Sequence, residues 1–227
     1  MTSALSPEQI QARIEKANAA HGAIPADKLV RGLVRLFDFS AEDEPDEFTF
    51  PAFSRASRDR IFGGQIIAQA MMAAARTVDP DKQVHSLHAY FLRGGSEALP
   101  LHFRVHRDFD GRAFSNRRVV VRQEGKVIFN LTASFQKPES GFSHQVPMPD
   151  LLPPGKCWDY SDAMARNPDI PDHMLERMAH PRPFELRSFR PAADAKATSQ
   201  YQWLRLRAPI EGDQLLHPAL LSFASAM

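Results

Sequence analysis

The sequence predicts an α+β fold in which a long antiparallel sheet wraps around one central helix. Residues 101–135 alternate apolar and polar side chains with the two-residue period of strands. A buried helix followed by such strands favours a layer of helix against sheet. The helix itself is indicated over residues 63–78 by apolar side chains at helical spacing: Ile66, Ile67, Ala70, Met71, Ala74, Ala75 and Val78.

An N-terminal helix is expected first. Ser6 suits its cap, Pro7 its first position and Gln9 a capping box. Because Ile10 and Ile14 are the only large apolar residues on it, we expect this helix to pack weakly or fray.

A second, amphipathic helix is expected over residues 27–39, and a first strand over 47–53, after an acidic loop at residues 42–44. The inward face of this helix is predicted to carry Leu29, Val30, Leu33, Val34, Leu36 and Phe37.

The central helix opens on Gly63 and Gly64, which permit close approach of another backbone or a ligand. Its first N–H groups are free to face an electron-rich atom. Alanines keep it thin enough to lie close to a sheet, and it is expected to end near Thr77 and Val78, before Pro80.

Turn signals divide the strands that follow. Asp110-Gly111 and Glu124-Gly125 each predict a tight turn. The apolar face of the meander is predicted to consist of Leu101, Phe103, Val105, Val119, Val121, Val127, Phe129, Leu131, Ala133 and Phe135.

Residues 137–183 differ in character, since nine of the 18 prolines lie there. Proline cannot donate to a strand ladder, so the segment reads as a surface linker with short helices at 160–166 and 172–179. Strands are expected at 184–189 and 199–207 and a helix at 214–227. The sequence FASA at 223–226 echoes FGGQ at 62–65.

Composition excludes several classes. The net charge of +1 argues against a general nucleic-acid binder. The single cysteine, Cys157, excludes an internal disulfide, fits a reducing compartment and is expected to be inert. No segment approaches the roughly 20 apolar residues of a membrane span. The N-terminus lacks the apolar stretch of a secretory signal, so we expect a cytoplasmic protein.

Four ordered motifs carry a family resemblance: FGGQIIAQA, VHSLHAYFLR, RDFDGRAFSNRRV and GKVIFNLTASFQ. They resemble the first half of a type II acyl-CoA thioesterase, a double-hotdog enzyme of fatty acid and lipid metabolism. The resemblance runs from residue 29 to 136 and resumes more loosely to residue 227. It implies two fused hotdog repeats, hydrolysis of fatty acyl-CoA, and no cofactor.

The resemblance divides the chain into an N-terminal extension (1–26), a first hotdog repeat (27–136), a proline-rich linker (137–183) and the start of a second repeat (184–227). The second helix barely begins, so its apolar face (Leu215, Leu216, Leu220, Leu221 and Phe223) is expected to lack a partner. We therefore interpret the chain as a truncated product or a fragment.

Catalytic residues do not carry over. The position of the family's catalytic Asp corresponds to Ala226, which cannot act as a base, and the hydroxyl and Gln positions lie beyond Met227. The chain alone is therefore expected to lack substantial activity. An alternative is a catalytically silent hotdog module that binds acyl-CoA or assembles with other subunits, and we expect a homo-oligomer.

Weaker candidates lie in the first repeat. Gly63, Gly64 and Gln65 are expected to bind substrate. Gln65 occupies the slot matching Ala226 and either orients a water or bonds backbone at a buried helix end. The strands of the remaining candidates, His85, Ser86 and Gln136, could flank Gln65, although strand histidines such as His85 and His88 are more often structural.

Six arginines crowd two adjacent strands and either meet coenzyme A phosphates or form a solvated outer face: Arg104, Arg107, Arg112, Arg117, Arg118 and Arg122. Other enzyme classes lack their signatures. No paired histidines with a flanking Glu support zinc, no G-x-S-x-G supports a serine hydrolase, and no D-x-x-x-x-H supports a hotdog dehydratase.

Overall fold

The computed structural model describes residues 5–19, 22–38, 40–41, 44–52, 60–188, 201–212 and 214–227. The chain divides into two compact units. The sheet unit comprises Val34–Ser143 and Glu211–Met227, and the helical unit comprises Met1–Leu33 and His144–Ile210.

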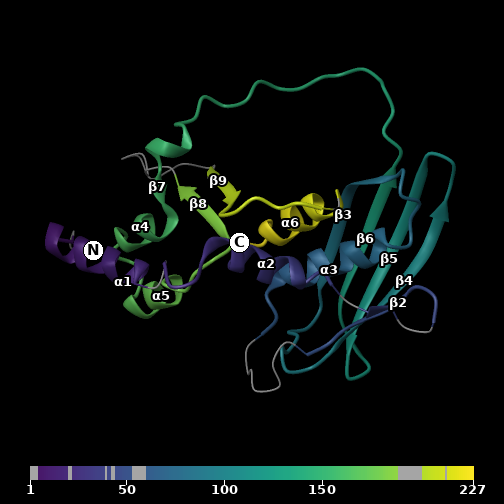
Figure 1. Ribbon diagram of the computed structural model, residues 1–227, viewed down its shortest axis with the longest axis horizontal. Coiled ribbons are helices and arrows are strands. Elements are labelled where there is room, and N and C mark those ends of the chain that lie inside the picture. The colour runs from purple at the N-terminus through teal and green to yellow at the C-terminus, as the bar shows by residue number, and fades with distance from the viewer. Residues whose placement is uncertain are drawn as a thin grey trace. The chain divides into compact units, whose positions relative to one another are not determined.

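An antiparallel sheet of six strands forms the sheet unit, in the order β1-β2-β4-β5-β6-β3 (Figure 1). Its alternation is the predicted one, since the apolar face from Leu101 to Phe135 is buried except for half-buried Val127. The expected first strand ends at Phe50, and position 53 lies outside the described residues. The strands are β1 (Ser40–Ala41), β2 (Glu47–Phe50), β3 (Gln83–Phe91), β4 (Leu101–Asp110), β5 (Phe114–Gln123) and β6 (Lys126–Gln136).

The β5–β6 turn confirms its prediction. Glu124 and Gly125 both have positive φ, 46° and 75°, which is the conformation of a two-residue type I′ turn. Glycine adopts this geometry without steric cost, and the Glu-Gly pair closes the β5–β6 hairpin with Gln123 opposite Lys126.

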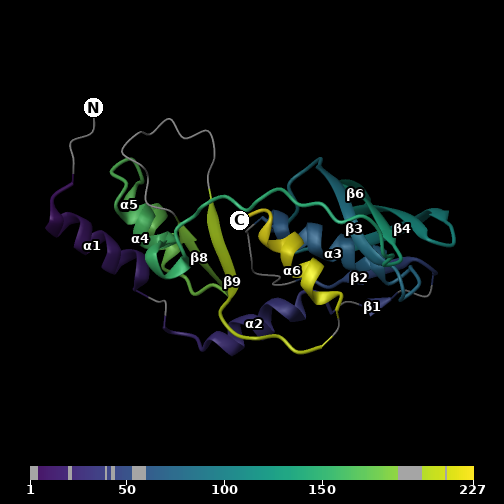
Figure 2. The same cartoon turned by 90° about the horizontal axis from the view of Figure 1, so that it is seen from above.

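The central helix α3 (Gly63–Ala75) lies against the inner face of the sheet (Figure 1). All its residues after Gly63 are buried, so it is covered on every side rather than along one stripe. The second cover is α6 (Leu216–Ala224), which lies beside α3 in both views (Figure 2). The helix is shorter than expected and ends at Ala75, with Arg76 as its C-cap.

The packing of α6 corrects one expectation. Its apolar face does have a partner, because Ala219 is fully buried, Leu220 is 5% exposed and both lie on a helix that packs on α3. Leu221, on the other side of α6, is 70% exposed. Within the described residues, α6 therefore buries only one side.

A cluster of buried cations holds the other end of α3. Arg117, only 1% exposed, donates to Thr77 Oγ1 and the Thr77 carbonyl, both at 2.8 Å, and to Asp110 at 2.7 Å. The Lys82 ammonium donates to Ser115 Oγ at 2.9 Å, and Ser115 donates to Asp110. The helix end is thereby attached to the β4–β5 hairpin.

Helix α2 (Ala26–Arg35) is shorter than the predicted 27–39, and position 39 lies outside the described residues. Two side chains, one from α3 and one from its C-cap, bond the chain just after α2. Gln69 Nε2 donates to the Leu36 carbonyl at 2.7 Å, and Arg76 donates to the Phe37 carbonyl at 3.3 Å. These donors satisfy carbonyls that a helix end leaves free. Three of the residues predicted to face inward are buried: Val30, Leu33 and Phe37.

In the helical unit, α1 (Pro7–Asn18) has the predicted Ser6–Gln9 capping box, but the expectation of weak packing is wrong. It packs on α4 (Tyr160–Ala165) and α5 (Asp172–Met178) around a small core of Ala17, Ala165 and Leu175. Arg13 reinforces this contact by donating to the carbonyls of Ala165, Asn167 and Ile170.

A second antiparallel sheet joins β7 (Trp158–Asp159), β8 (Phe184–Ser188) and β9 (Gln202–Leu206). The last two match the predicted strands, although residues 189–200 lie outside the described residues. The short helices expected in the proline-rich segment are α4 and α5. Cys157 is buried and unpaired.

Candidate functional site

The start of α3 has the geometry of an oxyanion-binding site. Its N-cap, Phe62, supplies no side-chain acceptor. Among the described residues, no hydrogen bond from the N–H groups of Gly63 and Gly64 is found, and the first bonds to the Phe62 carbonyl come from Gln65 and Ile66. Free N–H groups at the positive end of a helix stabilise negative charge.

Aromatic rings and the end of α6 surround this helix start. A methyl group on Gly63 would lie 3.2 Å from the ring of Phe91, at the end of β3, and 3.8 Å from Ala226 Cβ. The rings of Phe62 and Phe223 lie 5.0 Å apart. Sequence reasoning did not select these aromatic residues as site walls, although the FGGQ/FASA echo contains two of them.

The Gln65 side chain is 7% exposed. Of its two interpretations, the hydrogen bond to backbone is not found among the described residues, in which the side chain is buried at the helix start. The amide is therefore able to bind a water or a carbonyl oxygen, but it cannot serve as a general base.

The other candidates do not join Gln65. His85, exposed, has Nε2 2.9 Å from Ser134 Oγ, and exposed Ser86 lies opposite Ser134 in the β3–β6 register. Gln136, half-buried, pairs with Gln83 at the far end of the sheet, beyond the Arg117–Thr77 contact. A helix rises about 1.5 Å per residue, so Gln65 and Thr77 are roughly 18 Å apart. Both strands pack against α3, as expected, but His85, Ser86 and Gln136 lie on them far from Gln65.

The arginine-rich face is mostly neutralised. Arg104 pairs with Glu47, Arg107 with Asp46 and Arg118 with Asp108, as expected of a solvated outer face. The hydrogen bond from Arg107 is the main cause of the lowered pKa of Asp46. Arg117 departs from this interpretation because it is buried beneath the sheet, and Arg112 lies in the loop after β4.

A candidate metal site and a membrane-spanning helix are both absent from the described residues. The described side chains contain no group of three His, Cys, Asp or Glu that could hold a metal ion. No helix in the described parts of the chain is long and apolar enough to cross a membrane.

Three comparisons with known proteins agree. A family model described as "Acyl-CoA thioesterase N-terminal domain" matches residues 54–136. Human acyl-coenzyme A thioesterase 8 is 37% identical over 179 residues, which cover 73% of this chain and 56% of that protein. The chain thus spans little more than half the length of that relative.

Solved structures extend the comparison. An acyl-CoA thioesterase II, TesB2, from Mycobacterium marinum is 32% identical and superposes with a TM-score of 0.68, covering 86% of this chain and 67% of that one. A hot dog fold protein from Alicyclobacillus acidocaldarius, at 21% identity and a TM-score of 0.61, shares the fold.

Proposed function

Because the chain belongs to the type II acyl-CoA thioesterase family and has its hotdog fold, we propose that the protein acts on fatty acyl-CoA. The reaction of the family is thioester hydrolysis: water adds to the thioester carbonyl, the C–S bond breaks, and free fatty acid and coenzyme A thiol leave. The observation that supports it is the start of α3, where two free N–H groups lie beside Ala226.

We propose that Gly63 and Gly64 bind the thioester carbonyl oxygen through these N–H groups and that Gln65 orients the group bound there. As the carbonyl carbon becomes tetrahedral its oxygen gains negative charge, which donors held in place stabilise more strongly than they stabilise the ground state.

The general base is the part of the mechanism that these 227 residues do not supply. Ala226 Cβ lies 3.8 Å from the position that a methyl on Gly63 would occupy, so a carboxylate at 226 would sit beside the oxyanion donors. Alanine cannot accept a proton, and the Gln65 amide is no base. We therefore propose that thioester hydrolysis is the reaction of this family site and that the 227 residues, with alanine at position 226, bind acyl-CoA without hydrolysing it.

Thiol release from acyl-CoA substrates of several chain lengths tests this proposal, alongside binding measured by calorimetry. The expected result is saturable binding with no enzyme-dependent thiol release. Robust steady-state hydrolysis would contradict the silent site, and absence of both binding and hydrolysis would contradict the acyl-CoA proposal.

A homo-oligomer is the second part of the proposal, and β3 supports it. This nine-residue strand is at the edge of the sheet, and none of its residues is buried. Tyr90, Phe91 and Leu92 are between 49% and 60% exposed. Long apolar edge strands tend to pair with another strand. Sedimentation should show a dimer that the edge variant Tyr90→Lys weakens, and a wild-type chain that is monomeric at high concentration contradicts the proposal.

A cytoplasmic location is proposed from the buried, unpaired Cys157, which fits a reducing compartment. Cell fractionation with an antibody to the chain tests it.

A further inference from the structure

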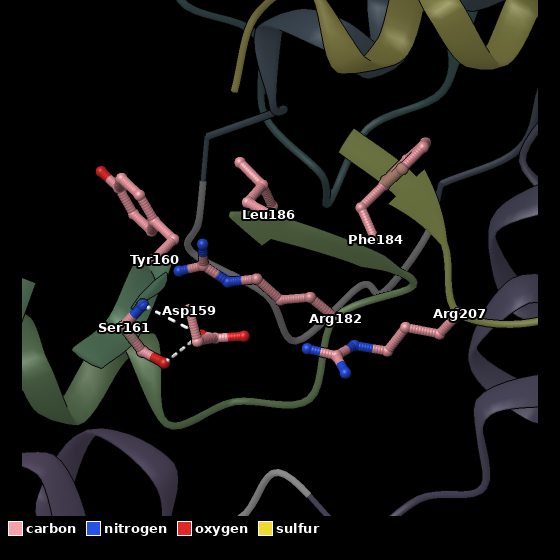
Figure 3. Close-up of a pocket in the computed structure, with 7 residues that line it drawn as sticks. All are labelled: Asp159, Tyr160, Ser161, Arg182, Phe184, Leu186 and Arg207. Atoms are coloured by element: carbon pink, nitrogen blue, oxygen red, sulfur yellow. Dashed lines mark hydrogen bonds between the residues drawn. The ribbon is translucent and has the colours of Figure 1, made fainter. Parts of the chain in front are cut away.

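A small pocket in the helical unit brings together two arginines from opposite strands of one hairpin. Arg182 precedes β8 and Arg207 follows β9, and the Arg207 N–H donates to the Pro183 carbonyl at 2.9 Å, so both residues lie at the same end of the strand pair. Phe184 and Leu186 line the pocket from β8 (Figure 3).

The opposite wall comes from the start of α4. Asp159, Tyr160 and Ser161 line it, and both arginine side chains extend toward them (Figure 3). The Asp159 carboxylate is already engaged, since its Oδ1 accepts from Ser161 N at 3.1 Å and from Ser161 Oγ at 2.6 Å. Neither arginine comes within ion-pair distance of it.

Two neighbouring arginines on the same two strands, unlike Arg182 and Arg207, do pair with a carboxylate. Arg187 and Arg205 both bond Glu185, at 2.7 and 2.5 Å, and Glu185 is buried between them. In the described part of the chain, Arg182 and Arg207 have no such carboxylate. Each guanidinium offers five N–H donors, so the pocket concentrates donors and positive charge beside one carboxylate, Asp159, that neither arginine pairs with.

Small anions with several oxygens fit this arrangement. Guanidinium groups bind phosphate through two parallel hydrogen bonds, and two of them can share three terminal oxygens. The pocket is small, so it accepts one compact group rather than an extended chain.

We propose that Arg182 and Arg207 form a binding site for a phosphate monoester. The sources of this chemistry are free phosphate and the terminal ribose phosphate of coenzyme A. The second source rests on the proposed function, in which the ligand is an acyl-CoA.

Calorimetric titration of the full chain with coenzyme A, dephospho-coenzyme A and inorganic phosphate tests the site. We expect coenzyme A to bind roughly tenfold or more tightly than the dephospho form, because charge-assisted hydrogen bonds to the monoester are lost. In Arg182→Gln/Arg207→Gln this preference should disappear. Phosphate binding that requires both arginines, without a preference for coenzyme A, supports the site and assigns free phosphate as its source.

Lys156→Gln is the matched control, since Lys156 is an exposed lysine of the same unit that forms no ion pair with the described residues, and its loss also removes one positive charge. It should leave the preference unchanged. Arg182→Lys/Arg207→Lys keeps the charge without the planar fork and should retain part of the preference, which separates binding from misfolding. Two outcomes overturn the site: equal binding of coenzyme A and its dephospho form with no phosphate binding that depends on the two arginines, or a preference that survives Arg182→Gln/Arg207→Gln. Absence of acyl-CoA binding, with the preference for coenzyme A over its dephospho form intact, rejects the proposed function alone.

Discussion

Gly64 lies directly against the backbone of Phe223. A methyl group at position 64 would come within 2.0 Å of the Phe223 carbonyl oxygen, a separation that no packed structure contains. The absence of a side chain at Gly64 therefore permits α3 and α6 to touch, and it places the end of α6 beside the proposed oxyanion donors.

Gly64→Ala should destabilise the sheet unit. Because the obstacle is backbone rather than a flexible side chain, α6 must move away from α3, and overpacking of this kind costs about 1–3 kcal/mol or more. Chemical denaturation followed by circular dichroism measures the loss in free energy of unfolding.

The matched control is Gly32→Ala in α2, where a methyl group would meet nothing within 4 Å. That variant should gain about 0.5–1 kcal/mol, because alanine reduces the entropy of the unfolded chain and favours helix. Equal effects of the two substitutions would show that α3 and α6 do not touch.

Arg117→Ala should be among the most damaging changes. It removes a fully engaged guanidinium, takes away the donors that it supplies to Thr77 and Asp110, and opens a cavity, for a combined cost of about 3–5 kcal/mol. Arg118→Ala, on the same strand but at an exposed pair with Asp108, should cost less than about 1 kcal/mol. Thermal melts compare the two, and similar losses would contradict the burial of Arg117.

Asp110 should make stability depend on pH. Burial alone would raise the pKa of Asp110, but hydrogen bonds from Arg117 and Ser115 outweigh it and hold that pKa below its ordinary 3.8. The group therefore stabilises the fold above the unfolded-state pKa, and this contribution disappears as the pH falls through the lower folded-state pKa.

Asp110→Asn should accordingly cost about 1 kcal/mol near neutral pH, a value reduced for its half-exposed position. The difference from wild type should shrink as the pH is lowered below about 4. Denaturation across that range is the measurement, and a difference independent of pH would refute the assignment.

Arg13→Ala should release α1 from the helical unit, since one guanidinium holds three carbonyls of the α4–α5 segment and pairs with Asp172 at 2.6 Å. Limited proteolysis should then cut near residues 19–25 faster than in wild type. Arg31→Ala, which breaks only the exposed Arg31–Asp27 pair, should not change the cleavage rate.

Ala226→Asp should place a carboxylate beside the free N–H groups of Gly63 and Gly64. The interaction with the helix start should raise stability by about 0.3–1 kcal/mol at low salt and less at high salt. Ala226→Asn, which has the same shape without the charge, should not show this salt dependence. A carboxylate that leaves the melting temperature unchanged at low salt would place position 226 away from α3.

The sequence predicted the elements whose patterns are local. The two-residue period from Leu101 to Phe135, the Glu124-Gly125 turn and the Ser6–Gln9 capping box each depend on residues a few positions apart, and each is present. The Gly63-Gly64 start and the FASA echo indicated where α3 and the proposed site begin.

Contacts between distant segments were decided only by the tertiary structure. The sequence analysis grouped Arg117 with the arginines of neighbouring strands, yet in β5 it lies on the buried face, where the carbonyls of Thr77 and Phe109 accept its hydrogen bonds and Asp110 offsets its charge. His85 and Gln136 lie in the sheet that covers α3, but at the end of the sheet away from the start of α3. Strand register sets this separation. The partners of α1 and α6 are likewise long-range. An apolar face shows in the chain that a residue will be buried, but the segment that covers it depends on which distant surfaces pack together.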